Sequence, residues 1–145
     1  MAADVTAMIG ALRRKGLKVT PQRHLLCSVI AVSDDHPTVE TVHQRAVQQM
    51  PTLSLKTVYT TLAELAELGL IRLSTLGTGT LRVDADVDPH AHLVCRSCGA
   101  VVDQPLEPAD RAALAHAASL GFQVEEQEVI YRGRCARCRT ASAQH

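Results

Sequence analysis

Aromatic side chains are almost absent from this chain of 145 residues, which has no tryptophan, two tyrosines and one phenylalanine. Its hydrophobic core must therefore be built from Leu, Val, Ile and Ala. No stretch approaches the ~20 consecutive apolar residues that a membrane-spanning helix needs. The first residues also lack the apolar segment and cleavage site of a secretory signal. We therefore expect a folded protein of the cytoplasm that contacts no membrane.

Net charge is absent too, because 15 Lys and Arg balance 15 Asp and Glu. The two halves of the chain nevertheless differ in sign. Residues 1–82 hold nine basic and six acidic side chains, a net charge of +3, whereas residues 83–145 hold six and nine, a net charge of −3. A basic first half favours an acidic partner such as nucleic acid.

The first half has the pattern of a small helical domain. Apolar residues recur at helical spacing in residues 5–15, and Thr20-Pro21, Thr38 and Ser54 are N-cap signals for three further helices. Two β-like runs at 70–73 and 80–83 then flank the turn sequence STLGTG. Helices followed by a small hairpin are typical of a winged helix-turn-helix, whose last helix enters the DNA major groove. The pattern is equally compatible with an amphipathic helix that only packs in a helical core.

The second half mixes strands and helix. The segment 84–89 is acidic, contains a proline, and is predicted to be a hinge. Strands are expected near 91–95, 100–104 and 122–131, with a helix from Pro108 to Leu120. The sequence thus predicts an α+β protein, with a winged helix over 1–83 and a small α/β domain over 90–145.

Four of the five cysteines lie in two C-x-x-C motifs, CRSC and CARC, which are separated by 36 residues. Each motif places two sulfur atoms on a tight turn, and two such turns form the four-thiolate environment typical of a structural zinc. Four protein ligands leave no open position for catalysis. A redox-active pair or buried apolar cysteines are the alternatives. The fifth cysteine, Cys27, lies on an apolar helix face and is expected to be a buried hydrophobic residue.

Two histidines, His90 and His92, alternate just before the first cysteine motif, so both side chains can lie on one face of a strand. Acidic residues lie nearby, and His36 precedes the third helix. Such nitrogen and oxygen donors suit Fe(II), Mn(II), Zn(II) or Ni(II). The alternative is a pair of surface histidines beside an acidic loop. The remaining histidines have no clustered partners and are expected to have no role: His24, His43, His116 and His145.

Taken together, these motifs resemble the ferric uptake regulator superfamily along nearly the whole chain. The matching stretches are TPQR at 20–23, HPT at 36–38, SLKTVY at 54–59, HAHLVCRSCG at 90–99 and CARC at 135–138. The resemblance implies a homodimeric bacterial repressor with an N-terminal winged helix that binds double-stranded operator DNA and a C-terminal dimerisation domain. It implies structural zinc ligands at Cys95, Cys98, Cys135 and Cys138.

Within that superfamily, the chain resembles the peroxide-responsive branch. The resemblance implies a regulatory Fe(II) or Mn(II) site formed by His36, Asp84, His90, His92 and Asp103. The iron-sensing branch usually has glutamate where this chain has Asp103. Hydrogen peroxide is then expected to oxidise His36 or His90 and release the DNA. The alternative within the family is an iron-dose-responsive repressor of iron-uptake genes that ignores peroxide.

The candidate DNA contacts lie mainly on the helix before the wing. Its expected exposed positions include Lys56, Thr57, Tyr59, Thr60 and Thr61, whose side chains can reach phosphates or base edges. Arg23, in the TPQR stretch, is a further candidate. We expect no enzymatic activity, because a non-haem iron oxygenase needs a substrate pocket and usually a larger scaffold. The other rival is a zinc-ribbon interaction module that binds no DNA.

Overall fold

Residues 4–142 are described by the computed structural model, and they form two units that divide between Val87 and Asp88. Unit 1 contains the residues up to Val87, and unit 2 those from Asp88 onward. The division lies inside the segment 84–89, where the sequence predicts a hinge. Among the described residues, no helix is long and apolar enough to cross a membrane. His145 lies outside the described residues.

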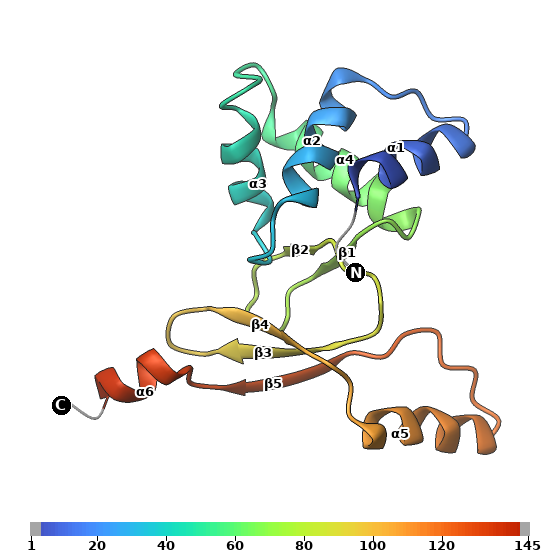
Figure 1. Ribbon diagram of the computed structural model, residues 1–145, viewed down its shortest axis with the longest axis vertical. Helices are drawn as coiled ribbons and strands as arrows, with labels where there is room; N and C mark the ends of the chain where they lie inside the picture. Colours follow the sequence, from blue (N-terminus) through green and yellow to red (C-terminus); the bar gives the residue numbers. More distant parts are fainter. Residues whose placement is uncertain (1–3, 143–145) are drawn as a thin grey trace. The chain divides into compact units, whose positions relative to one another are not determined.

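Unit 1 consists of four helices and a hairpin (Figure 1). The helices are α1 (Val5–Arg14), α2 (Pro21–Ala31), α3 (Val39–Ala46) and α4 (Leu55–Glu67). Three of them begin at the predicted caps, because the hydroxyl groups of Thr20, Thr38 and Ser54 each accept a hydrogen bond from the backbone N–H three residues later. Gly69, with φ of 72°, follows the last helix in the left-handed conformation that glycine tolerates.

An aliphatic core holds these helices together. Leu12, Leu26, Leu62 and Leu65 come from three different helices and are fully buried. Cys27 lies in the same core, and burial raises the pKa of its thiol to about 11. This cysteine is therefore a small apolar core residue, as its position on the helix predicts.

The hairpin of unit 1 pairs β1 (Arg72–Ser74) with β2 (Arg82–Asp84) in antiparallel register, with Leu73 opposite Val83. It also contacts the segment that leads into α3. The backbone N–H of Val83 donates to the carbonyl of Pro37 over 2.9 Å, and Thr38 forms an isolated bridge with Arg82. Backbone hydrogen bonds thus connect the hairpin to the segment that begins α3.

Unit 2 is a three-stranded sheet in the order β4-β3-β5, formed by β3 (Ala91–Cys95), β4 (Val101–Gln104) and β5 (Val129–Gly133). β3 is antiparallel to β4 and parallel to β5. Two helices, α5 (Pro108–Ser119) and α6 (Ala136–Ser142), lie at opposite ends of the sheet (Figure 1). The α+β prediction, with a helical region and wing hairpin followed by an α/β domain, is confirmed.

Two details of unit 2 differ from the sequence-based expectation. The strand predicted near 122–131 forms only over Val129–Gly133, because the residues before it are exposed and pair with no described strand. Helix α6 was not predicted, since it has only seven residues and no clear amphipathic pattern. The extent of β5 depends on long-range pairing with β3, which local periodicity does not reveal.

Candidate metal centres and nucleic-acid surface

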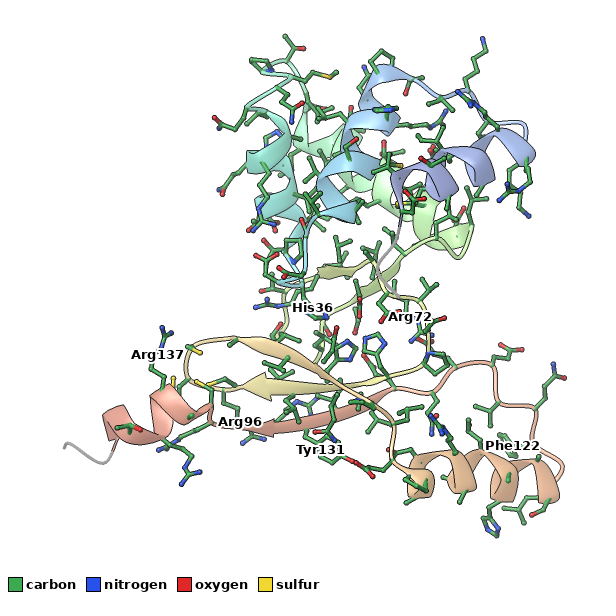
Figure 2. All side chains as sticks on the ribbon, viewed as in Figure 1. His36, Arg72, Arg96, Phe122, Tyr131 and Arg137 are labelled. Carbon is green, nitrogen blue, oxygen red and sulfur yellow. The ribbon has the colours of Figure 1, made fainter. Side chains whose placement is uncertain are left out.

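The two cysteine motifs meet at one end of the unit 2 sheet. β3 ends at Cys95 and the parallel strand β5 ends at Gly133, which is its register partner. Cys98 lies on the turn after β3, and Cys135 and Cys138 lie at the start of α6. Because parallel strands end at the same edge of a sheet, motifs far apart in sequence are brought together. Figure 2 shows their sulfur atoms near Arg137.

The spacing of the sulfur atoms fits a tetrahedral zinc site. The four Sγ atoms all lie within 4.8 Å of one another, and those of Cys98 and Cys135 are 3.8 Å apart. A zinc–sulfur bond of about 2.3 Å implies about 3.8 Å between the corners of the tetrahedron. None of these cysteines forms a disulfide. The donor set therefore fits zinc.

Backbone N–H groups prepare two of these thiols for ionisation. Hydrogen bonds from the backbone of Cys135 and Cys98 lower the pKa of Cys95 to about 5, and the Cys135 N–H lies 3.4 Å from the Cys95 sulfur. The backbone of Cys138 lowers the pKa of Cys135 in the same way. The pKa of Cys138 rises to about 12, because its proton is hydrogen-bonded to Cys135. A cation bound by these sulfur atoms would favour their thiolate form.

A second group of metal-type donors lies on the β3–β4 hairpin of unit 2. The register places His92 directly opposite Asp103. The Oδ1 atom of Asp103 lies 3.3 Å from Nε2 of His90 and 3.5 Å from Nε2 of His92. Two imidazoles and one carboxylate thus point to the same place, an arrangement that suits Fe(II) and similar divalent ions.

Hydrogen bonding orients His90 as a ligand. Its Nδ1 lies 2.6 Å from the backbone carbonyl oxygen of Asp88, and an imidazole bonded to a carbonyl must donate the proton from that nitrogen. The lone pair is then on Nε2, which lies 3.0 Å from Nε2 of His92. Neighbouring ligands of an octahedral ion with bonds of about 2.1 Å are about 3.0 Å apart, so the spacing fits metal coordination.

Unit 1 contributes a separate pair of donors. Nε2 of His36 lies 3.5 Å from Oδ2 of Asp84, the last residue of β2. His36 has a φ of 49°, which is uncommon for a residue other than glycine. Its carbonyl accepts a hydrogen bond of 3.2 Å from Arg82, and this bond helps to hold the strained turn. The five predicted regulatory ligands are therefore divided, two in unit 1 and three in unit 2.

The predicted recognition helix α4 presents an exposed polar stripe. Lys56, Tyr59 and Thr60 are exposed and follow the i, i+3, i+4 spacing of one helix face. Thr57 is half-buried. Thr61 was expected on this face but is only 6% exposed, because it shares the inward face with Leu62 and Leu65. The ammonium and hydroxyl groups of the stripe are of the kinds that bind phosphates and base edges.

Arg23, the fourth predicted DNA contact, uses its guanidinium inside unit 1. Its Nε and Nη2 atoms donate to Oε2 of Glu64 over 3.3 and 2.9 Å, and Nη1 donates to the carbonyl of Lys18 over 2.7 Å. These bonds attach α2 to α4, the candidate recognition helix. A DNA contact by Arg23 stays a prediction, and the sequence did not indicate Glu64 as its partner.

Comparisons with known proteins show the family and the fold of this chain. The model of the ferric uptake regulator family matches residues 14–132. The peroxide operon regulator of Bacillus subtilis is 29% identical over 94% of each chain. The peroxide-responsive repressor PerR of Staphylococcus epidermidis is 28% identical, covering 94% of this chain and 91% of that one. The solved structure of the Helicobacter pylori ferric uptake regulator covers 95% of both chains at 18% identity, with a TM-score of 0.80.

Replacement of one zinc-type ligand tests the cysteine cluster. We expect Cys98→Ser to lower the bound zinc from one ion per chain to well under half, because a hydroxyl is a poor substitute for a thiolate. The melting temperature should fall as well, since metal binding contributes directly to folding. Elemental analysis and thermal denaturation measure the two effects. Cys27→Ala is the matched control, as it removes a thiol from the core of unit 1 and should keep the zinc. Full zinc in Cys98→Ser would contradict the assignment.

Proposed function

Because the chain belongs to the ferric uptake regulator family, and is thus a metal-dependent transcriptional regulator and not an enzyme, we propose that it represses transcription until hydrogen peroxide inactivates it. The observation that carries this proposal is the cluster of His90, His92 and Asp103 on one hairpin of unit 2. It consists only of imidazoles and a short carboxylate, the donor set that the resemblance associates with peroxide sensing.

In the proposed regulatory site, these three residues bind one Fe(II) or Mn(II) together with His36 and Asp84 of unit 1. These residues would hold the ion with nitrogen and oxygen donors only, a donor set that suits Fe(II) and Mn(II). Since the ligands come from both units, the bound ion favours one orientation of the units over others. Metal binding then raises the affinity for DNA, and DNA binding raises the affinity for the metal by the same factor, because one coupling free energy determines both changes.

Fe(II) held by these residues would supply the redox chemistry that reaction with hydrogen peroxide requires. In the net reaction, one peroxide oxygen is inserted into the ring C–H bond of a ligating histidine and the other leaves as water. The imidazole loses two electrons and peroxide gains them. We assign this oxidation to His36 or His90. The oxidised ring is a poorer ligand, so the site loses affinity for the ion and the protein releases its operator.

The cysteine cluster has a structural role in this proposal. Zinc bound by Cys95, Cys98, Cys135 and Cys138 joins the end of β3 to the start of α6. Four protein ligands leave no position for a substrate. Thiolates of this kind persist in a reducing compartment, which favours the cytoplasm as the place of action.

Regulators of this family bind operator DNA as dimers, and unit 2 has a surface suited to a second copy of the chain. Helix α5 has no buried residue. After it, Leu120 and Phe122 are 69% and 72% exposed, and on the sheet Val102 and Tyr131 are also exposed. Phe122 and Tyr131 are labelled in Figure 2. Apolar side chains in this number favour a protein interface. We propose that these four apolar residues of unit 2, called here its apolar surface, take part in the homodimer interface, while Arg23, Lys56, Thr57 and Tyr59 contact the duplex.

Peptide mass spectrometry tests the peroxide proposal. The protein is loaded with zinc and Fe(II), exposed briefly to hydrogen peroxide and digested with trypsin. We expect one added oxygen on His36, in the peptide 24–45, or on His90, in the peptide 83–96. His24 and His43 share the first peptide and are internal controls that should stay unmodified. Protein loaded with Mn(II) is the metal control.

An added oxygen that appears equally with Mn(II), or on His24 and His43, would contradict site-specific oxidation. Absence of added oxygen together with metal-dependent DNA binding would instead support the iron-dose-responsive repressor.

Removal of one imidazole tests the regulatory site. We expect the metal-loaded His92→Ala protein to bind a duplex selected by the wild-type protein with more than tenfold lower affinity. The reason is that the site loses a ligand held by the sheet. Zinc content and oligomeric state should be unchanged. His116→Ala, an exposed histidine of α5, is the matched control. Normal metal-dependent binding by His92→Ala, measured by fluorescence anisotropy, would remove this residue from the site.

A charge placed in the apolar surface of unit 2 tests the dimer. We expect Phe122→Asp to shift the protein toward the monomer in analytical ultracentrifugation, because the interface would have to bury an unpaired carboxylate. Val32→Asp changes an equally exposed apolar residue of unit 1 and should leave the dimer intact. If Phe122→Asp remains fully dimeric at low concentration, the interface lies elsewhere.

A further inference from the structure

One side-chain contact on the candidate DNA surface involves a residue that has no role so far. The hydroxyl of Tyr59, on α4, donates a hydrogen bond of 2.8 Å to Oε1 of Glu40. Glu40 lies in the first turn of α3, and both side chains are exposed. The contact lowers the pKa of Glu40 and raises the pKa of Tyr59, because the bond favours a charged carboxylate and a neutral phenol. Tyr59 is therefore held by α3 as well as by its own helix.

This hydrogen bond restricts what Tyr59 can contact on DNA. A phenol has a single donor proton, and phosphate oxygens only accept hydrogen bonds. While the proton is donated to Glu40, the hydroxyl cannot donate to a phosphate. The ring and the remaining lone pairs stay available. These suit the apolar methyl group and the amino donors that base edges present in the major groove.

The charge of Glu40 acts in the same direction. An exposed carboxylate hydrogen-bonded to Tyr59 repels the phosphate backbone and lowers affinity for any duplex, whatever its sequence. Such a residue weakens non-specific binding. It also fixes the ring of Tyr59 before DNA arrives, so less conformational entropy is lost on binding. Both effects increase discrimination between duplexes rather than overall affinity.

We propose that Glu40 is a specificity-determining residue of DNA recognition, which positions Tyr59 to contact base edges instead of phosphates. This inference rests on the proposed function, because it requires α4 to be the recognition helix. It assigns to α3 a part in sequence selection, through a residue that itself needs no contact with a base.

The test is a double-mutant cycle of Glu40→Ala, Tyr59→Phe and the variant that combines them. A fourth variant, Glu40→Gln, is the conservative replacement. The probes are a duplex recovered by the Mn(II)-loaded wild-type protein from a random-sequence pool and a scrambled duplex of the same composition. The measured ratio is the affinity for the recovered duplex divided by the affinity for the scrambled duplex. We expect Glu40→Ala to lower this ratio by about tenfold, the effect of one well-formed base contact. Tyr59→Phe should lower it similarly. The double variant should lose no more than either single variant, because both changes remove the same hydrogen bond.

Glu40→Gln separates the hydrogen bond from the charge. Glutamine keeps an acceptor oxygen, so the Glu40→Gln variant should retain most of the wild-type affinity ratio. Because it lacks the negative charge, this variant should also bind both duplexes more tightly at low salt. The control for a lost negative charge is Glu67→Ala, an exposed residue of α4, which should leave the ratio unchanged. Thermal denaturation confirms that each variant is folded.

Two results would overturn the inference: an unchanged ratio in Glu40→Ala, or a ratio in Glu40→Gln as low as in Glu40→Ala. The latter would assign the effect to charge alone. If the wild-type protein recovers no duplex from the pool, the proposed function itself fails, and the two failures are thus distinguishable.

Discussion

The register of β3 within the sheet of unit 2 determines both candidate metal centres. This strand carries His92 near its start and Cys95 at its end. Its antiparallel neighbour supplies Asp103 opposite His92, and its parallel neighbour ends beside the second cysteine motif. A slip of one residue would move every side chain of the strand to the other face. The sheet therefore has to form correctly before either centre can exist, and nine residues, 90–98, contribute to two different sites.

The two units differ in how they are stabilised. Unit 1 has a continuous aliphatic core contributed by all four helices. In unit 2, few residues are buried as a whole; among the described residues these are Ala91, His92, Val94 and Cys95. So small a core gives little hydrophobic stabilisation. Zinc at the cysteine cluster and a second copy on the apolar surface would supply the rest, since anything that binds only the folded state stabilises it.

The proposed mechanism uses this difference. In this proposal, the well-packed unit 1 holds two of the regulatory ligands, His36 at the turn before α3 and Asp84 at the end of β2. The other three lie on the hairpin of the less stable unit. An ion that needs all five ligands links the state of the sensor to the position of the recognition helix. The bonds from Arg23 to Glu64 and from Tyr59 to Glu40 connect α4 to α2 and α3, so the proposed DNA-binding surface would move together with these helices.

The sequence by itself determined the features that depend on near neighbours. Thr20, Thr38 and Ser54 begin helices because a cap needs only the next three residues, and each C-x-x-C motif forms its own turn. The donor set of the candidate sites could also be predicted, since it depends on residue type and on the resemblance of motifs. Only the tertiary structure decided which partners meet across the fold. Thr61 faces inward, Arg23 binds Glu64, Tyr59 binds Glu40, and the strand expected from residue 122 begins at Val129. These outcomes depend on contacts between residues far apart in the chain, where local periodicity carries no information.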